Sequence, residues 1–223
     1  MFKKERTVKK KPATFWGKLW YFIWYEDSVA SWVVNIILAF IIIKYILYPG
    51  IGLAVGTDLP IVAVVSESME HDGSFDEWWQ SEARCDNEDC TQQEWYNNYN
   101  INKNDFDDFP FSNGFQKGDI MFLTGVEADE VEVGDVIVYL SGKEYPIIHR
   151  AIRVWNEGNI TYFETKGDHN QNQIIDKRLN EQMVSEEKLM GRAVFRIPWL
   201  GYIKIGFVDL LTRTGAADVA NGS

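Results

Sequence analysis

The strongest feature of the hydrophobic pattern is one long apolar run near the start of the chain. From Ala30 to Tyr48 the sequence reads ASWVVNIILAFIIIKYILY, which is long enough to cross a hydrocarbon layer as a helix. Lys44, near the distal end, can extend its ammonium group to the lipid headgroups. A cleavable secretory peptide would be shorter and closer to Met1, and a buried core helix would have an amphipathic face. The pattern therefore predicts a transmembrane anchor and its exit over residues 29–56.

The residues before this run predict its orientation. Tryptophan and tyrosine residues between 15 and 25 are typical of a membrane interface, and basic residues outnumber acidic ones at the N-terminus. The basic residues of this head are Lys3, Lys4, Arg6, Lys9, Lys10, Lys11 and Lys18, against Glu5 alone. Because basic segments stay on the cytoplasmic side, we expect a single-pass protein of the cell membrane. Residues 1–28 would be cytoplasmic and interfacial, and everything after Tyr48 would be extracytoplasmic.

After the anchor the pattern changes to short β-branched runs. Such runs are typical of strands, and turn residues separate them. The predicted strands cover residues 59–65, 119–123, 135–140, 146–154 and 160–165. The fold class is therefore mainly β, with one β domain over 57–213 and a flexible tail over 214–223. Residues 203–211 are too short and interrupted for a second span, while Trp199, Leu200 and Tyr202 could rest on a membrane surface.

A polar segment over residues 72–116 interrupts the strand pattern. It is rich in tryptophan and tyrosine, so we expect an ordered insertion, partly helical between Phe75 and Tyr99, that caps one rim of the sheet. Its two cysteines, Cys85 and Cys90, are either a local disulfide or two free thiols. Eleven acidic residues lie between 72 and 108, against two basic ones. This surface could contact a protein-export channel, but solvation of an extracytoplasmic surface explains it more simply.

The total charge narrows the possible functions. The chain of 223 residues has a formal net charge of −11. Nucleic-acid binding needs clustered lysine and arginine to contact phosphates, so this charge argues against it. No histidine pair has helical metal-ligand spacing, so we expect no metal and no other cofactor.

Three short segments carry residues suited to nucleophilic catalysis. Ser68 follows the first strand, and His149 lies within a later one. A neutral imidazole can remove the proton of a serine hydroxyl, and a carboxylate can orient that imidazole. Asp168 or Asp176 would supply the carboxylate. The Ser68 backbone N–H and the Ser66 hydroxyl would form the oxyanion hole. Taken singly, these residues have simpler interpretations as turn or half-buried residues.

Four motifs in the same order resemble those of type I signal peptidases, in the archaeal and endoplasmic-reticulum branch. PIVAVVSESM resembles the family's nucleophile box, and NGFQKGDIMFL and VEVGDVIVYL resemble its two Gly-Asp strands. YPIIHRAI resembles its general-base box, and FETKGDHN resembles its acidic box. The resemblance covers roughly residues 61–205. It implies a serine endopeptidase that removes signal peptides from exported preproteins after small residues, with Ser68, His149 and Asp168 in its catalytic site. A further aspartate of the family is best matched by Asp176.

Two positions depart from the family pattern. Glu67 replaces the usual glycine between the two serines, and His71 replaces a proline after the methionine. These departures keep open a catalytically inactive, membrane-anchored binding module as the alternative. A self-cleaving repressor-type peptidase would need a DNA-reading domain where this chain has its apolar run.

Overall fold

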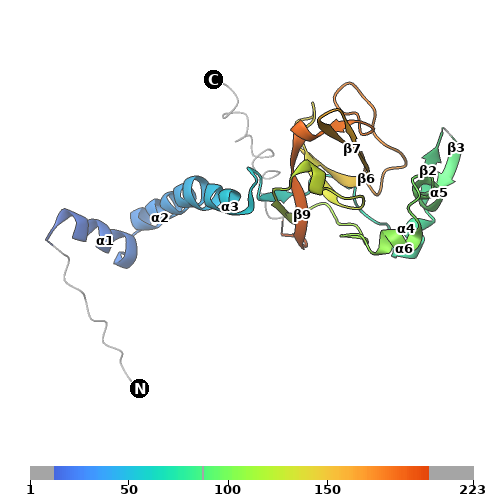
Figure 1. The fold of residues 1–223 in the computed structure, drawn as a ribbon. Coiled ribbons are helices and arrows are strands. Elements are labelled where there is room, and N and C mark those ends of the chain that lie inside the picture. The colour runs from blue at the N-terminus through green and yellow to red at the C-terminus, as the bar shows by residue number, and fades with distance from the viewer. Residues whose placement is uncertain (1–12, 87, 201–223) are drawn as a thin grey trace, which may run out of the picture. The chain divides into compact units, whose positions relative to one another are not determined.

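The computed structural model describes residues 13–86 and 88–200, and the chain forms two compact units, residues 1–51 and 52–223. The predicted segments 203–211 and 214–223, Tyr202 and most of the basic head lie outside the described residues. Figure 1 draws helices α1 and α2 of the first unit and the strands of the second.

The first unit is helical. Helix α1 (Phe15–Tyr25) begins at Thr14 and α2 (Val29–Ile42) at Ser28, and each of these side chains accepts a backbone N–H of the first turn. A π-helical turn, η1 (Ile43–Leu47), joins α2 to α3 (Tyr48–Val55). Together Val29–Val55 form 27 helical residues that are long and apolar enough to cross a membrane, judged by length and composition.

The second unit is built on an antiparallel sheet of seven strands, which confirms the predicted mainly β fold. Their order is β1-β4-β9-β5-β6-β7-β8. The strands are β1 (Ile61–Ala63), β4 (Ile120–Thr124), β5 (Val136–Tyr139), β6 (Ile147–Glu157), β7 (Ile160–Lys166), β8 (Val184–Ser185) and β9 (Leu189–Ile197). Short 3-10 helices η2 (Ala128–Glu130) and η3 (Glu186–Lys188) lie in two connections.

Strand β9 lies between β4 and β5 and was not predicted from the sequence. It pairs with both neighbours, through Ala193 with Leu123 and through Arg192 with Ile137. Its apolar pattern is broken by Gly191 and Arg192, and the register shifts in both ladders. A bulged strand of this kind lacks the regular alternation from which strands are recognised.

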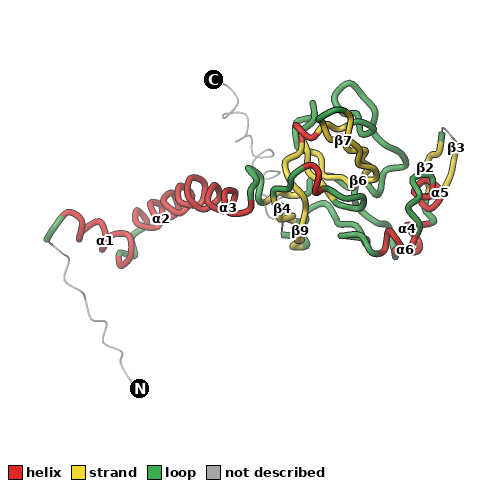
Figure 2. Tube along the Cα trace, in the orientation of Figure 1, coloured by secondary structure: helices red, strands yellow, loops and turns green. Residues whose placement is uncertain are grey.

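The insertion forms a small lobe with its own aromatic core. Its elements are α4 (Phe75–Trp79), the hairpin β2 (Glu82–Cys85) and β3 (Glu88–Thr91), α5 (Gln92–Asn97) and α6 (Lys103–Asp107). A disulfide joins Cys85 to Cys90 across the hairpin. Figure 2 shows this mixture of red helices and yellow strands at the side of the sheet, so the partly helical prediction is confirmed.

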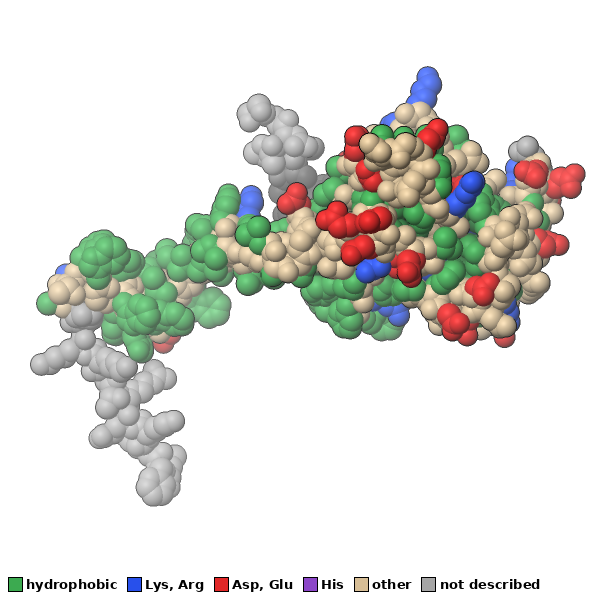
Figure 3. All heavy atoms as spheres, viewed as in Figure 1, with side chains coloured by type: hydrophobic (Ala, Val, Ile, Leu, Met, Phe, Trp, Pro, Cys, Tyr) green, Lys and Arg blue, Asp and Glu red, His purple; other side chains and the backbone are tan. Residues whose placement is uncertain are grey.

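The lobe and the sheet have separate cores, and the lobe core extends onto the sheet. The lobe core contains Trp78, Trp79, Tyr96 and Phe106, and it includes Ile152 of β6. A separate core beneath β1 contains Met69. The segment between β1 and the lobe is therefore held by buried side chains on both sides. Acidic side chains spread over the outer surface of this unit (Figure 3).

Candidate active site

Ser68 lies in the turn that follows β1. The next residue, Met69, is fully buried in the core beneath β1, and its carbonyl accepts the Phe115 backbone N–H at 2.9 Å. The Ser68 carbonyl accepts the His169 backbone N–H at 2.9 Å. Burial on one side and these hydrogen bonds on the other fix the backbone, so that the Ser68 hydroxyl is held at the surface of the sheet.

His149 is held opposite this hydroxyl by β6. In the ladder between β5 and β6, His149 lies opposite Ile137, and only 2% of its surface is exposed. The Nε2 atom lies 2.9 Å from Ser68 Oγ, within hydrogen-bond distance. The structure therefore brings together the two side chains that the sequence placed 81 positions apart.

The other ring nitrogen of His149 contacts Glu181, which the sequence analysis did not single out. Glu181 Oε1 lies 2.5 Å from His149 Nδ1, and Glu181 is fully buried. Its Oε2 accepts the Ile174 backbone N–H at 2.7 Å, and its Oε1 accepts the hydroxyls of Thr165 at 3.1 Å and Tyr139 at 3.3 Å. Every contact holds the carboxylate in the orientation that faces the ring.

The pKa of Glu181 reflects this environment. Burial alone would raise the pKa, but the charge and the hydrogen bond of His149 and the Ile174 N–H lower it below its ordinary value. Glu181 is therefore ionised at neutral pH and available to stabilise a protonated imidazole. The hydrogen bond at Nδ1 also selects the tautomer in which Nε2 is the free base toward Ser68.

Asp168, expected to orient His149, is engaged elsewhere in the structure. Its two oxygens accept hydrogen bonds from Arg150 Nε at 3.0 Å and Arg150 Nη2 at 2.7 Å. They also contact the Tyr96 hydroxyl and His71 Nε2, each at 3.2 Å. Burial would raise the pKa of Asp168, but Arg150 and His71 hold it well below its usual range. The geometry therefore makes Asp168 the anchor of a buried ion pair, and not the partner of the His149 ring.

Asp176 is also placed away from the His149 ring. It accepts the backbone N–H groups of Arg178 at 2.7 Å and Leu179 at 2.9 Å, as an aspartate at the start of a turn does. Its side chain is 43% exposed and lies 3.8 Å from Lys143 Nζ. This turn brings the chain back toward β7, so that Glu181, five residues later, reaches the ring.

Ser66, the residue expected in the oxyanion hole, lies beside Ser68. Its hydroxyl is 3.1 Å from Ser68 Oγ and is exposed to solvent. Glu67, between the two serines, has its side chain 67% exposed, with its carboxylate 3.9 Å from Lys117 Nζ. The departure from glycine at this position is therefore accommodated at the surface.

His71 connects the site to the inserted lobe. Its ring stacks on Trp78 with 3.6 Å between the centroids, and the Trp78 indole N–H donates to the Asp168 carbonyl at 3.2 Å. Arg150 Nη1 and Nη2 donate to the carbonyls of Pro110 and Phe111 at the other end of the insertion. The lobe therefore surrounds the Arg150–Asp168 pair from both sides.

Lys166 is a second buried basic residue, besides Arg150, where the lobe contacts the sheet. Its ammonium donates to Gln92 Oε1 of the lobe at 2.8 Å and lies 4.9 Å from the Trp95 ring. Burial lowers the pKa of Lys166 to about 7, although Asp168 and Glu181 act in the opposite direction. Across residues 13–86 and 88–200, no group of three or more histidine, cysteine, aspartate or glutamate side chains is arranged to hold a metal ion.

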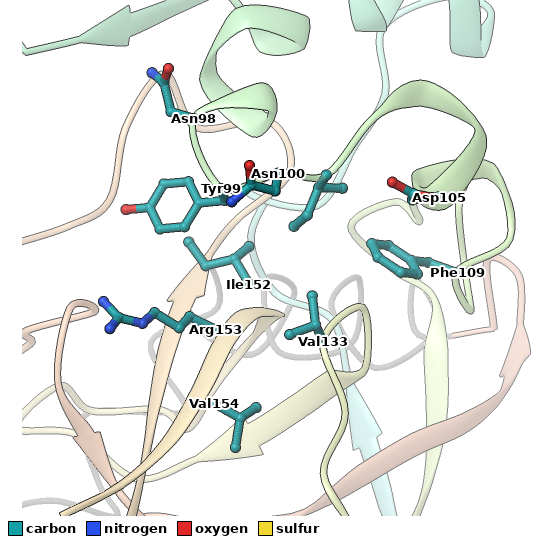
Figure 4. A pocket seen from close by; sticks show the side chains of 10 residues that line it. Asn98, Tyr99, Asn100, Asp105, Phe109, Val133, Ile152, Arg153 and Val154 are labelled. Atoms are coloured by element: carbon teal, nitrogen blue, oxygen red, sulfur yellow. The ribbon is translucent and has the colours of Figure 1, made fainter.

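A separate cleft of about 700 Å³ opens between the lobe and β6. Figure 4 shows Tyr99, Phe109, Val133 and Ile152 around it, with Arg153 at its edge. Neither Ser68 nor His149 lines this cleft. The contact between Ser68 and His149 is therefore not part of this cleft.

A serine, a histidine and a buried carboxylate joined in this order form the arrangement of a serine hydrolase. No family model matches the chain. Over 94 residues it is 36% identical to the signal peptidase complex catalytic subunit SEC11 of Colletotrichum graminicola, covering 41% of this chain and 55% of the relative. Over 96 residues it is 32% identical to the signal peptidase complex catalytic subunit SEC11C of Homo sapiens, covering 41% and 49%. The chain thus spans about half the length of the curated relatives it matches, and they confirm the predicted resemblance to signal peptidases.

Proposed function

We propose that the chain is a membrane-bound serine endopeptidase that removes N-terminal signal peptides from exported preproteins. The observation that carries the proposal is the continuous contact from Ser68 Oγ through the His149 ring to Glu181. The similarity to signal peptidase catalytic subunits supports the substrate class. In this proposal residues 1–28 form the cytoplasmic head, 29–56 the anchor and 57–213 the extracytoplasmic catalytic domain, at the cell membrane. The insertion is 72–116 and the flexible tail 214–223.

The reaction follows from the hydrogen-bond order. His149 Nε2 takes the proton of Ser68 Oγ while that oxygen attacks the scissile carbonyl carbon. Glu181 stabilises the imidazolium that forms. The Ser68 backbone N–H and the Ser66 hydroxyl donate to the oxyanion. His149 then protonates the leaving amine as the C–N bond breaks, and a water, activated by the same ring, hydrolyses the acyl-enzyme and restores Ser68.

Substrate binding would use the edge of the sheet. Strand β1 is an outermost strand and leads directly to Ser68. A preprotein segment in extended conformation would pair along this edge, and small recesses would exclude large residues one and three positions before the cut. The apolar helix Val29–Val55 would keep enzyme and substrate at one bilayer surface, which raises their effective concentration. In this proposal the partners are preproteins and the lipid bilayer, and the acidic insertion solvates an extracytoplasmic surface.

The test is cleavage of a preprotein with an Ala-x-Ala site by the full chain in detergent. We expect Ser68→Ala and His149→Ala each to lower kcat by at least about 10⁴-fold. His169→Ala is the matched control, because its exposed ring faces Asp72 and not the nucleophile. Retained turnover in Ser68→Ala would disprove the assigned nucleophile. Absence of cleavage by the wild-type chain would favour an anchored binding module.

A further inference from the structure

Strand β6 has a neighbouring strand on its β5 side along only its first part. With β7 it pairs from Arg150 to Glu157, whereas its pairing with β5 ends at Arg150. Ala151 makes the last backbone contacts on the β5 side, accepting the Gly134 N–H and donating to the Asp135 carbonyl, both at 2.8 Å. The β5 side of β6 is therefore open beyond Ala151.

The ladder with β7 determines which backbone groups face this open side. Thr161 of β7 donates its N–H to Glu186, on the side of β7 away from β6. In an antiparallel pair, residues directly opposite one another either both point toward the partner strand or both point away from it. Asn156 lies opposite Thr161, and Val154 lies two positions before it. Both therefore direct their N–H and C=O groups to the open side, and across residues 13–86 and 88–200 no other element bonds to these groups there.

The cleft of about 700 Å³ lies along this open side of β6. Val133 lines the cleft just before β5 begins, where β5 separates from β6, and its side chain is 40% exposed. Ile152 and Val154 of β6 and Phe109 of the insertion add to the apolar lining, as Figure 4 shows. The volume falls within the range of ligand-binding pockets, about 300–1,000 Å³. An open strand edge beside apolar side chains is a surface to which an extended peptide can add as a further strand.

Two charged residues of the cleft give it a direction. Arg153 is 64% exposed, and its Nη1 lies 3.9 Å from Glu164 Oε2, whereas Glu164 Oε1 accepts the Tyr99 hydroxyl at 2.6 Å. An exposed ion pair of this length is weak, so the guanidinium is available to a second carboxylate. Asp105 of α6 also lines the cleft, and Figure 4 shows it at the opposite end from Arg153. A bound segment with a carboxylate at one end would therefore be held in one orientation.

We propose that the open edge of β6 and this cleft form a docking site for an extended segment of a partner polypeptide, which adds as a strand beside Val154 and Asn156. Apolar side chains of the segment pack on the walls of the cleft, and an acidic residue pairs with Arg153. Neither Ser68 nor His149 lines the cleft, so the bound segment is not presented to the nucleophile. The partner is therefore held by the protein without being cleaved at this site.

The experiment uses the full chain in detergent and a short fluorescent peptide in which valine alternates with threonine, with an aspartate at one end. We expect binding, measured by fluorescence anisotropy. Replacing the aspartate of the peptide by lysine should weaken binding by about three- to tenfold at low salt, and by less at high salt. N-methylation at alternate peptide positions should abolish binding in one phase and change it little in the other, because only one set of N–H groups faces β6.

Variants of the chain test the edge and the charge separately. Asn156→Pro removes one N–H of the open edge without removing a bond within the sheet, and it should weaken peptide binding by at least about tenfold. Arg153→Gln should remove the preference for aspartate over lysine in the peptide. Arg178→Gln, at an exposed arginine outside the cleft, is the matched control and should keep that preference. The thermal midpoint of each variant checks that it is folded.

Hydrogen exchange of the wild type gives a test that depends on no variant. The peptide should protect the amides of Val154 and Asn156, and it should leave the amide of Trp155, which faces β7, unchanged. Absence of peptide binding, or binding that leaves the two edge amides exchanging freely, overturns the inference.

Two other results would assign the cleft to a different occupant and would also overturn it. Inhibition of preprotein cleavage by the peptide would assign the cleft to the substrate. A dimer that the peptide dissociates would assign it to a second copy of this chain. Ser68→Ala should bind the peptide as the wild type does, so that a failure of the proposed function and a failure of this inference are seen separately.

Discussion

The second unit contains two buried pairs of a histidine and a carboxylate, and they differ in what surrounds them. In the first, His149 contacts Glu181 at one nitrogen and the Ser68 hydroxyl at the other. In the second, His71 contacts Asp168 at one nitrogen, and the other, Nδ1, is buried without a hydrogen-bond partner in the described part of the chain. A histidine and a carboxylate are therefore paired twice in this unit, but only the His149–Glu181 pair contacts a serine hydroxyl.

The difference in charge balance explains why the roles diverge. Asp168 is neutralised by Arg150, which is fully buried with it. Glu181 instead has the His149 imidazole as its hydrogen-bond partner, and no arginine or lysine among the described residues neutralises it. A carboxylate that is already neutralised contributes little to a new positive charge, whereas Glu181 can stabilise the imidazolium as it forms. The first pair is thus suited to catalysis and the second to holding the inserted lobe in place.

Replacing the carboxylate of each pair should give the largest contrast. Glu181→Gln keeps the size of the side chain but removes its charge, and its amide can present the wrong group to Nδ1. We expect kcat for preprotein cleavage to fall by about 10²–10⁴-fold, with little change in KM. Steady-state kinetics of the detergent-solubilised chain measure both.

Asp168→Asn is the matched comparison. It leaves Arg150 as a buried charge without its partner, so we expect a loss of about 3–5 kcal/mol in unfolding free energy. Turnover per folded molecule should fall by less than tenfold. Asp176→Asn, in an exposed turn, should alter neither quantity appreciably. A larger loss of turnover in Asp168→Asn than in Glu181→Gln would reverse the assigned roles.

Gly167 lies between the two pairs, and its substitution should have an intermediate effect. A Cβ atom at this position would lie 2.8 Å from His149 Nε2 and 2.7 Å from the Ser68 carbonyl oxygen. Gly167→Ala must therefore displace the contact between Ser68 and His149. Because small displacements at reacting groups are costly, we expect kcat to fall by about 10²-fold.

A matched substitution shows whether that loss is local. Gly158→Ala, at the exposed β6–β7 turn, meets no atom within 4 Å but has positive φ, so it introduces backbone strain without touching the site. Its turnover should stay near the wild-type value. Wild-type turnover in Gly167→Ala would show that the two side chains move together and that their spacing is not fixed by Gly167.

Lys166, next to the second pair, should give the smallest effect, and it should be seen in stability. Its pKa of about 7 in the folded state lies below the ordinary value of 10.5, so the unfolded state binds more protons between these values. The unfolding free energy therefore rises as pH increases from about 7 toward 10.5, because the folded protein holds Lys166 without its charge in this range. Below pH 7 Lys166 is charged in both states, and the cost of burying that charge is present in full. Lys166→Met should remove this contribution.

The measurement is the thermal unfolding of wild type and Lys166→Met at pH 7 and pH 9.5. The unfolding free energy of wild type minus that of Lys166→Met should be larger at pH 9.5 than at pH 7 by about 1–3 kcal/mol. Lys188→Met, on the 3-10 helix η3, is the exposed control and should show no such change. A difference that does not vary with pH would mean that Lys166 stays protonated when buried.

The sequence predicted the regular strands because their apolar pattern is local. Strands β4, β5, β6 and β7 all lie within or close to the predicted ranges. Strand β9 was missed because Gly191 and Arg192 interrupt its pattern, and its position between β4 and β5 depends on pairings distant in the chain. Local patterns therefore predicted the fold class but missed one interior strand of the sheet.

The candidate site was predictable to the same extent. The positions of Ser68 and His149 followed from motifs, and the structure brings them into contact. Glu181 was missed because nothing in the sequence around this buried residue distinguishes it from the glutamates that lie at the surface. Glu181 reaches the His149 ring because a turn at Asp176 reverses the chain. Hydrogen bonds from Thr165 and Ile174, which only the folded loop supplies, then hold its carboxylate in place. Asp168 was the natural expectation because its motif is recognisable, whereas its ion pair with Arg150 is visible only in three dimensions.

The way the lobe surrounds Asp168 limits how this chain can be shortened. Removing residues 72–116 would also remove Trp78 and Tyr96, together with the Pro110 and Phe111 carbonyls that accept from Arg150. In a shortened chain the Arg150 guanidinium and the Asp168 carboxylate would lose several hydrogen-bond partners, and water would reach them. A minimal enzyme derived from this chain would need new side chains to enclose that pair before the loop carrying Glu181 could hold its shape.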